Sequence, residues 1–418
     1  MDLVNGLSVV DPEVFQAIID EEDRQVNMLE MIASENYTSS AVIDAVGSVL
    51  TNKYAEGYPN ARYYGGCEHV DIVEQLAIDR AKKLFGADHA NVQPHSGSQA
   101  NLAAYSALMK VGDKALGLAL DQGGHLTHGH AVNMTGKLYN FAHYGVNRDD
   151  EYINYEEMEK IAQEHRPKVI VIGTTAYPRN LDFAKAKKIA DEVGAFLLAD
   201  VAHISGLIAA NVHPSPVGIA DVITMSTHKT LRGPRGGMIL CNETIAKKID
   251  KAVFPGSQGG PLMHVIAGKA VALKEAMTDN FTELQKKTVS NAKTLAKTLN
   301  DGGLRLVSGG TDNHLILVDV TPLGINGKSA EDILSSVGII VNKNAIPYDS
   351  LPPSISSGIR IGTPALTSRG FGEKEMETVG GIIVDLFKSD ANSELKKKAK
   401  KIILELCTTY PAPGIKIR

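Results

Sequence analysis

Short apolar runs alternate with amphipathic stretches along most of the chain. Continuous apolar runs predict buried strands at residues 90–94, 168–172, 195–199 and 221–225. Apolar positions at helical spacing predict helices at residues 72–84, 99–109 and 184–193. Strand–helix–strand units with uninterrupted apolar strands are typical of a parallel sheet that helices cover on both faces. We therefore predict an α/β fold that binds its ligands at the carboxyl ends of the strands.

The pattern changes towards both ends of the chain. Residues 13–31 carry apolar positions at helical spacing, which predicts a helical N-terminal arm over residues 1–35. Beyond residue 280 we predict a helix at 281–299, strands at 314–320 and 338–341, and a helix that begins near Ser329. We therefore divide the chain into this arm, a large domain over residues 36–280 and a smaller α+β domain over residues 281–418.

Composition narrows the class of protein. A chain of 418 residues usually forms more than one core, which agrees with this division. A net charge of -5 and a pI near 6.2 argue against nucleic acid as the main partner. We interpret the lysines at residues 396–401 as the solvated face of a helix rather than as a patch that binds nucleic acid. Cys67, Cys241 and Cys407 lie far apart, which predicts a reducing compartment. The chain shows neither a signal-peptide pattern nor an apolar run of the roughly 18–20 residues that cross a bilayer, so we expect a cytoplasmic protein without a membrane partner.

Lys229 occupies the most informative position. It follows the predicted strand at 221–225 and precedes a glycine-rich turn, in the segment STHKTLRGPRGG. A lysine at a strand end can lose water, which lowers its pKa and makes its amine a nucleophile toward carbonyls. The strand at 195–199 ends on Asp200. Because pyridoxal phosphate requires an anion at its ring nitrogen and an amine at its aldehyde, the two residues predict this cofactor.

Two glycine-rich turns are candidates for binding the phosphate. Ser96, Gly97 and Ser98 lie between a predicted strand and a predicted helix, where free backbone N–H groups form an anion site. A plain N-cap serine is the alternative interpretation. The turn at residues 254–261 is the second candidate, because its glycines allow backbone N–H groups to approach a phosphate closely.

Three histidines stand within six residues in the segment GGHLTHGH: His125, His128 and His130. Together with Asp200 and His203 they allow a metal cluster as an alternative hypothesis. The segment lacks the i, i+4 histidine pair of a helical metal site, and stacking on a cofactor ring explains one histidine without a metal. We therefore predict no metal, a cofactor contact for His203, and either a structural or a functional role for His128 and His130.

Two further segments carry candidate chemistry. A polar loop at residues 52–66 combines tyrosines, glycines and Glu56, and has too many aromatic residues for a disordered segment. Glu56 is a candidate acid/base, with a solvated loop carboxylate as the alternative. Arg360 lies between glycines in an extended segment, where its guanidinium suits the capture of a carboxylate, with a surface salt bridge as the alternative.

The chain resembles serine hydroxymethyltransferase over nearly its whole length. The matching segments are residues 32–36, 53–59, 92–101, 123–129, 200–203, 227–237, 254–261, 309–314 and 358–364. The resemblance implies a fold-type I pyridoxal-phosphate transferase, whose large domain holds a mainly parallel seven-stranded sheet between helices. It also implies reversible transfer of the hydroxymethyl carbon of serine to tetrahydrofolate, which gives glycine and 5,10-methylenetetrahydrofolate in one-carbon metabolism.

The same resemblance implies a role for each candidate residue. Lys229 would bind the cofactor covalently as an aldimine, and the other catalytic residues would be Glu56, Tyr64 and His228. Cofactor contacts within one subunit would come from Asp200, His203, His125, Ser96, Gly97, Ser98, Thr175, Ser226 and Arg235. A second subunit would add Tyr54, Gly259 and Gly260, so the active unit would be at least a homodimer. Serine would contact Ser34, Arg360, Glu56 and Tyr63, and tetrahydrofolate would contact Leu120, Gly124, Leu126 and Asn344.

Two alternative functions stay open. A pyridoxal-phosphate aldolase would cleave β-hydroxy amino acids without folate. A non-catalytic or RNA-binding protein on the same scaffold would have no need of Lys229, Asp200 and Arg360. The segment DSLPPSI at residues 349–355 departs from the Ser-Pro-Phe version that is more usual in this family. That departure leaves open the folate contacts of residues 352–354 and the choice between tetrahydrofolate and a modified pterin.

Overall fold

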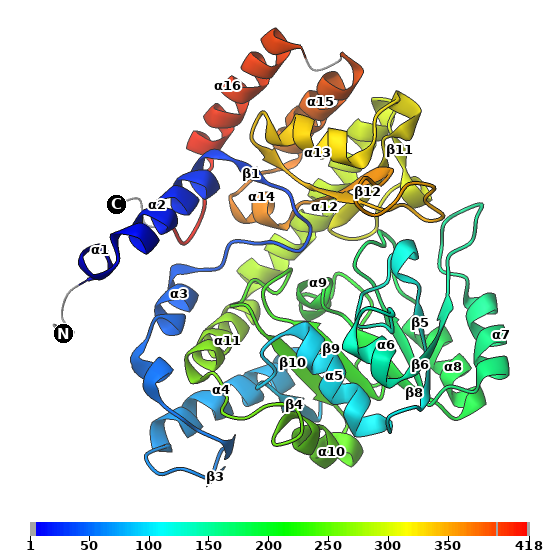
Figure 1. Ribbon diagram of the computed structural model, residues 1–418. Coiled ribbons are helices and arrows are strands. Elements are labelled where there is room, and N and C mark those ends of the chain that lie inside the picture. The colour runs from blue at the N-terminus through cyan, green and yellow to red at the C-terminus, as the bar shows by residue number, and fades with distance from the viewer. Residues whose placement is uncertain (1–5, 390–391, 416–418) are drawn as a thin grey trace.

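A seven-stranded sheet forms the centre of the computed structural model, which describes residues 6–389 and 392–415 (Figure 1). Its order is β4-β10-β9-β8-β7-β5-β6. The strands are β4 (His89–Asn91), β5 (Lys114–Leu118), β6 (Asn140–Tyr144), β7 (Val169–Gly173), β8 (Phe196–Asp200), β9 (Val222–Ser226) and β10 (Gly237–Cys241). Strand β10 runs antiparallel to β4 and β9, and the remaining pairs are parallel. The predicted α/β fold with a mainly parallel sheet is therefore confirmed.

Side chains of this sheet alternate between two apolar cores. Along β7, Ile170 and Ile172 belong to one core and Val169 and Val171 to the other, since successive side chains of a strand point to opposite faces. The first core is covered by α4 (Glu68–Phe85), α7 (Tyr155–His165), α8 (Phe183–Val193) and α11 (Met263–Ala276). The second is covered by α5 (Gly97–Leu108) and α10 (Glu243–Val253). Burial on both faces explains why the central strands are uninterrupted apolar runs.

Three strands of the sheet have no counterpart in the sequence prediction. Strand β5 (KALGL) contains no β-branched residue, and β6 (NFAHY) is an edge strand with several polar side chains. Strand β10 begins directly at the end of the glycine-rich turn after Lys229. Strand β6 therefore lacks the continuous apolar run on which the prediction depended, whereas the apolar runs of β5 and β10 contain or adjoin glycine and were overlooked.

The C-terminal part builds a second, smaller core. Its antiparallel sheet has the order β11-β12-β15-β14, and most of its apolar residues form one cluster, beside a smaller cluster of Val307, Leu317 and Ile346. The strands are β11 (Arg305–Leu306), β12 (Leu315–Asp319), β14 (Asn342–Asn344) and β15 (Gly358–Gly362). The helices are α12 (Asp279–Asp301), α13 (Gly327–Ser335), α14 (Pro364–Ser368), α15 (Glu373–Lys388) and α16 (Ser393–Thr409). In Figure 1, α12 runs from the large sheet up to this core.

The prediction that the N-terminal helix continues to residue 31 is wrong. Helix α2 (Pro12–Asn27) stops earlier, and β1 (Leu29–Glu30) pairs in parallel with β13 (Ile339–Ile340). Backbone hydrogen bonds join the Leu29 N–H to the Gly338 carbonyl and the Met31 N–H to the Ile340 carbonyl (both 2.8 Å). This strand pairing, which involves a segment about 300 residues away, outweighs the local helical pattern.

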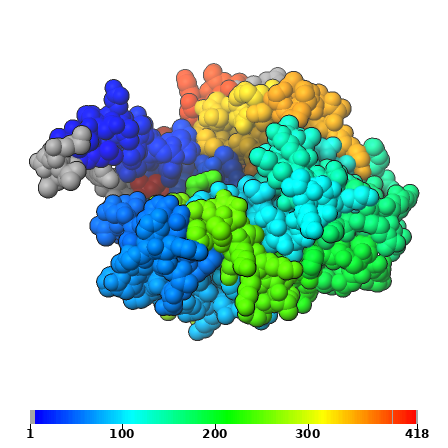
Figure 2. Space-filling view, turned by 60° about the horizontal axis from the view of Figure 1, so that its bottom comes forward, coloured from blue at the N-terminus to red at the C-terminus, as the bar shows by residue number. Residues whose placement is uncertain are grey.

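The remaining short elements lie around the two cores. They are α1 (Leu7–Val10), α3 (Ser40–Val46), β2 (Gly57–Tyr58), β3 (Ala61–Arg62), α6 (Met134–Leu138) and α9 (Ser205–Ala209). Figure 2 shows the N-terminal helical segment projecting from the body of the molecule. The domain boundaries at residues 35 and 280 stay predictions, and the first five residues of the predicted arm lie outside the described residues. Among the helices of the described residues, none has the length and apolar character that crossing a membrane requires.

Candidate active site

Asp200 and Lys229 lie at one edge of the large sheet. Asp200 ends β8 and Lys229 follows β9, and these strands are parallel neighbours, so their carboxyl ends meet. Burial, together with the charges of Arg360 and Arg235, lowers the pKa of the Lys229 amine to about 8, and the charge of Asp200 opposes this change. The amine is therefore far easier to deprotonate than an exposed lysine, as the sequence pattern predicts.

Asp200 is an ionised carboxylate held by three donors. Its Oδ2 accepts hydrogen bonds from His128 Nε2 (3.0 Å) and Asn101 Nδ2 (2.8 Å), and its Oδ1 accepts one from the Ala202 N–H (3.1 Å). Burial alone would raise its pKa, but the hydrogen bond and charge of His128 hold the pKa well below the ordinary value. A fixed anion of this kind suits a protonated ring nitrogen.

Two histidines stack behind this edge. His203 Nδ1 lies 3.4 Å from His314 Nε2, and the two buried rings are 25° from parallel. Burial lowers the pKa of His203, and it lowers the pKa of His314 to about 3. Both rings are therefore neutral at physiological pH, so His203 can donate or accept a hydrogen bond without carrying charge.

Arg360 reaches this edge from the small domain. It stands on β15, where its Nη1 donates to the Thr175 carbonyl (2.8 Å), its Nη2 to Ser34 Oγ (3.4 Å) and its Nε to Asn342 Oδ1 (3.1 Å). Thr175 Oγ1 in turn donates to the Gly124 carbonyl (2.6 Å). The predicted carboxylate-binding pair Arg360 and Ser34 is therefore in contact, and its charge acts on Lys229.

The N-terminus of α5 forms the third part of the site. Ser96 is the N-cap, and its Oγ accepts from the Gln99 N–H (3.2 Å), so the N–H groups of Gly97 and Ser98 remain available to an anion. A Cβ on Gly97 would lie 2.7 Å from Ser226 Oγ, so glycine is needed for this close approach to β9. The predicted residues Ser96, Gly97 and Ser226 therefore lie together.

We name these groups the strand-end cluster, which comprises Lys229, Asp200, His125, His203, Thr175, Arg360, Ser34, Ser96, Gly97 and Ser226. His228 lies beside it and accepts a hydrogen bond from the Gly236 N–H (3.4 Å). Burial, with the charges of Arg235 and Lys229, lowers the pKa of His228 to about 3, so this ring is neutral. The side chains of Ser98 and Arg235 are exposed.

A second group, the tyrosine-loop cluster, is made of Tyr54, Glu56, Tyr64, Gly259 and Gly260. Tyr54 Oη donates to Glu56 Oε1 (3.2 Å), and the Tyr54 ring packs at 5.0 Å against the ring of Tyr64. Gly260 packs against the Tyr54 ring, where an added Cβ would come within 3.0 Å of the ring carbon Cζ. Among the described residues, no hydrogen bond joins these five residues to the strand-end cluster.

Tyr63 and two of the predicted folate residues, Leu120 and Leu126, are exposed. Tyr63 is 75 % exposed and packs beside Phe254. Leu120 and Leu126 are exposed on the loop after β5, and Gly124 between them is buried. Asn344 lies on β14, next to the strand that carries Arg360.

The metal hypothesis finds a candidate group but not free ligands. Donor atoms of His125, His128 and Asp200 lie within 4.8 Å of one another. Both ring nitrogens of His128 are used, because Nε2 donates to Asp200 and Nδ1 accepts from the His125 N–H (3.3 Å). His125 Nδ1 is paired with Thr127 Oγ1 (2.7 Å). Hydrogen bonding therefore accounts for the group, and we retain the prediction of no metal.

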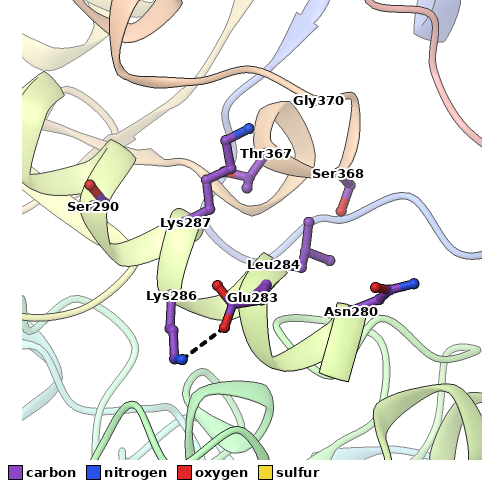
Figure 3. A pocket seen from close by; sticks show the side chains of 9 residues that line it. All are labelled: Asn280, Glu283, Leu284, Lys286, Lys287, Ser290, Thr367, Ser368 and Gly370. Carbon is purple, nitrogen blue, oxygen red and sulfur yellow. Dashed lines mark hydrogen bonds and ion pairs between the residues drawn. The ribbon is translucent and has the colours of Figure 1, made fainter. Parts of the chain in front are cut away.

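The pocket in Figure 3 contains none of the predicted residues. It lies beside α12 and α14 and is lined by Asn280, Glu283, Leu284, Lys286, Lys287, Ser290, Thr367, Ser368 and Gly370. Two of these residues, Lys286 and Glu283, form an ion pair (2.8 Å). We assign it no role in the chemistry.

Sequence reasoning missed two residues of this site. Asn101 bonds Asp200, Thr127 and Thr224 at once, and its signal is a buried amide within the alanine-rich helix α5. The sequence predicts that His314 begins a strand, but no pattern in the neighbouring residues indicates that its ring contacts His203. Asn101 contacts Asp200, and His314 contacts His203.

Comparison with known families supplies an independent finding. The sequence model of one family, described as serine hydroxymethyltransferase, matches residues 7–383.

Proposed function

The chain belongs to the serine hydroxymethyltransferase family of pyridoxal-phosphate-dependent enzymes, and we propose that it transfers the hydroxymethyl carbon of serine to tetrahydrofolate. The products are glycine and 5,10-methylenetetrahydrofolate, and the reaction is reversible. The observation that carries this proposal is the pair of Lys229, with its lowered pKa, and the ionised Asp200 at adjacent strand ends.

The residues of the strand-end cluster suit pyridoxal phosphate. Lys229 would bind the aldehyde, Asp200 the ring nitrogen and the N-terminus of α5 the phosphate, while His125, His203 and Thr175 would contact the ring and its hydroxyl. Ser226 and Arg235 would complete this set. When bound, the cofactor supplies an electron-accepting ring conjugated to the nitrogen of the amino acid.

Arg360 and Ser34 would hold the carboxylate of serine. A guanidinium presents parallel N–H donors to a carboxylate, so it fixes orientation as well as position. Orientation would matter because the cofactor ring, when bound, could accept electrons only from a substrate bond that is aligned with it. Arg360 therefore contributes through positioning, an effect that is worth several orders of magnitude in rate in well-aligned systems.

A second copy of the chain would complete the site. Tyr54 is 53 % exposed and Tyr63 is 75 % exposed, and the tyrosine-loop cluster has no hydrogen bond to the strand-end cluster within the described residues. We propose a homodimer in which Tyr54, Gly259 and Gly260 of one subunit reach the phosphate of the other. Glu56 would hold or move the proton of the serine hydroxyl, with Tyr64 and Tyr63 beside it, and His228 would act beside Lys229.

Leu120, Gly124, Leu126 and Asn344 would contact tetrahydrofolate. The exposed leucines flank a loop at the carboxyl end of β5, on the side where ligands of such sheets bind. We also propose a cytoplasmic location, because Cys67, Cys241 and Cys407 are buried free thiols.

Serine labelled at its β-carbon tests the proposal. We expect the purified protein with pyridoxal phosphate to form labelled methylenetetrahydrofolate and unlabelled glycine, and Lys229→Ala to form neither. Serine cleavage that is undiminished without tetrahydrofolate would favour the aldolase. A protein that binds no pyridoxal phosphate would exclude both activities.

A further inference from the structure

Lys269 is a buried cation outside the proposed set of catalytic and binding residues. It stands on α11, is 1 % exposed, and donates to the carbonyl oxygens of Val92 (2.6 Å), Pro94 (2.9 Å) and Gly237 (2.8 Å). An ammonium has three N–H donors, so each donor has an acceptor. Among the described residues, none forms an ion pair with it.

Burying an ammonium without a carboxylate partner is unfavourable. Burial lowers the pKa of Lys269 to about 7, with Glu74 opposing the change. An apolar side chain of similar volume would avoid the desolvation. A costly buried cation of this kind is more often found at functional sites than in ordinary cores.

The three carbonyls belong to the two segments that form the phosphate end of the site. Val92 and Pro94 lie in the short segment that leads to Ser96, the N-cap of α5, and Gly237 begins β10 after the turn that carries Arg235. The Gly237 N–H donates to the Pro94 carbonyl (3.0 Å), so the ammonium lies where these segments join.

The same segment is held from its other side by Gln258. The Gln258 side chain accepts from the His95 N–H (3.1 Å) and donates to the Gln93 carbonyl (3.0 Å). Gln258 directly precedes Gly259 and Gly260. Lys269 therefore fixes a segment that carries the phosphate-binding turn at Ser96 and is joined to the Gly259–Gly260 turn, which is proposed to reach the phosphate of the other subunit.

The charge of Lys269 also affects the pKa values of two nearby histidines. It contributes to the lowered pKa values of His95 and His228, after the larger effect of burial on each. A Cβ on Gly236 would lie 2.6 Å from Lys269 Cε, so the turn after Lys229 packs directly on this side chain. A positive charge behind a helix N-terminus favours an anion in front of it.

We propose that Lys269 is a positioning residue for the cofactor phosphate: it fixes the two backbone segments of the phosphate site and adds a buried positive charge behind it. This inference rests on the proposed function, because it takes pyridoxal phosphate as the ligand of the strand-end cluster.

Comparing pyridoxal phosphate with pyridoxal, which lacks the phosphate, tests this role. We expect Lys269→Met to raise the Kd of pyridoxal phosphate about 10- to 100-fold, the range for losing hydrogen bonds of charged groups. The Kd of pyridoxal should change less than about twofold, since its contacts with Lys229 and Asp200 remain. Leu273→Ala, a cavity on the same helix, serves as the control and should leave the ratio of the two Kd values unchanged.

Equal weakening for both compounds would make Lys269 a purely structural residue and overturn the proposal, as would unchanged affinity for both. If Lys269→Met does not fold, the same comparison is made with Lys269→Gln, which keeps N–H donors but loses the charge. Wild-type protein that binds neither compound would instead refute the proposed function.

Discussion

Arg62 holds the loop that presents Glu56, and its removal has a calculable effect. Its Nη1 donates to the carbonyls of Ala55 and Gly57 (both 2.9 Å), on either side of Glu56. Its Nη2 donates to Glu74 Oε2 (2.6 Å), and the side chain of Glu74 is 0 % exposed. Arg62→Met therefore leaves a buried carboxylate without its ion pair, with the Gln93 amide and the charge of Lys269 left to favour its ionised form.

The expected loss follows from the titration of Glu74. Burial already raises its pKa, with Arg62 opposing. Without Arg62 we expect the carboxyl to be protonated in the folded state at pH 7. In the unfolded state an ordinary glutamate has a pKa near about 4.3, so keeping the proton at pH 7 costs about 3.7 kcal/mol relative to an ionised carboxyl with an unshifted pKa. The deficit against wild type is at most this large, because the pKa of Glu74 is already raised in the wild type. Because the folded pKa lies above the unfolded one, this cost shrinks as pH falls and is about 1 kcal/mol at pH 5.

Urea unfolding at pH 5 and pH 7 checks this reasoning, with Arg62→Met, Glu74→Gln and the double variant compared with wild type. We expect the deficit of Arg62→Met to fall between pH 7 and pH 5. The double variant should recover most of the pH-dependent part, because it has no buried carboxyl at this position. A deficit that is the same at both pH values, or a double variant no more stable than Arg62→Met, would refute the argument.

Three further predictions concern the strand-end cluster. Cofactor-free Lys229→Met should melt at a higher temperature than wild type at pH 7, because the folded state depresses the pKa of this amine to about 8. The advantage should decline above that pH, as the wild-type amine loses its proton, and melts at pH 7 and 9.5 measure it. Arg360→Lys should raise the KM for serine at least about tenfold by losing the fork of donors, with cofactor affinity nearly unchanged; equal losses would make Arg360 structural. Asp200→Asn should lower kcat about 100-fold or more while serine still binds, because an amide cannot stabilise a protonated ring nitrogen; steady-state kinetics with unchanged kcat would contradict this role.

The strand-end residues were predictable because the topology itself places them. Asp200 and Lys229 each follow an apolar strand, and neighbouring parallel strands bring their carboxyl ends together whatever the loops do. The N-cap at Ser96 was predictable for the same kind of reason, since its pattern is local.

The contacts between distant segments were not predictable in this way. Arg360 meets Thr175 and Ser34 through the packing of the small domain against the large one. Strand β1 pairs with a strand about 300 residues away, so its helical pattern was misleading. The sequence gives only a weak indication of the role of Lys269, which is a lysine among the buried apolar positions of α11. The carbonyl groups that accept its hydrogen bonds can be identified only from the folded structure.

Locating the lysine that binds the cofactor tests the central claim most directly. Protein saturated with pyridoxal phosphate is reduced with borohydride, digested, and its peptides are weighed by mass spectrometry. The account predicts that the phosphopyridoxyl group is attached to Lys229. A group attached to another lysine, or no attachment at all, would contradict the assignment of the strand-end cluster as the catalytic centre.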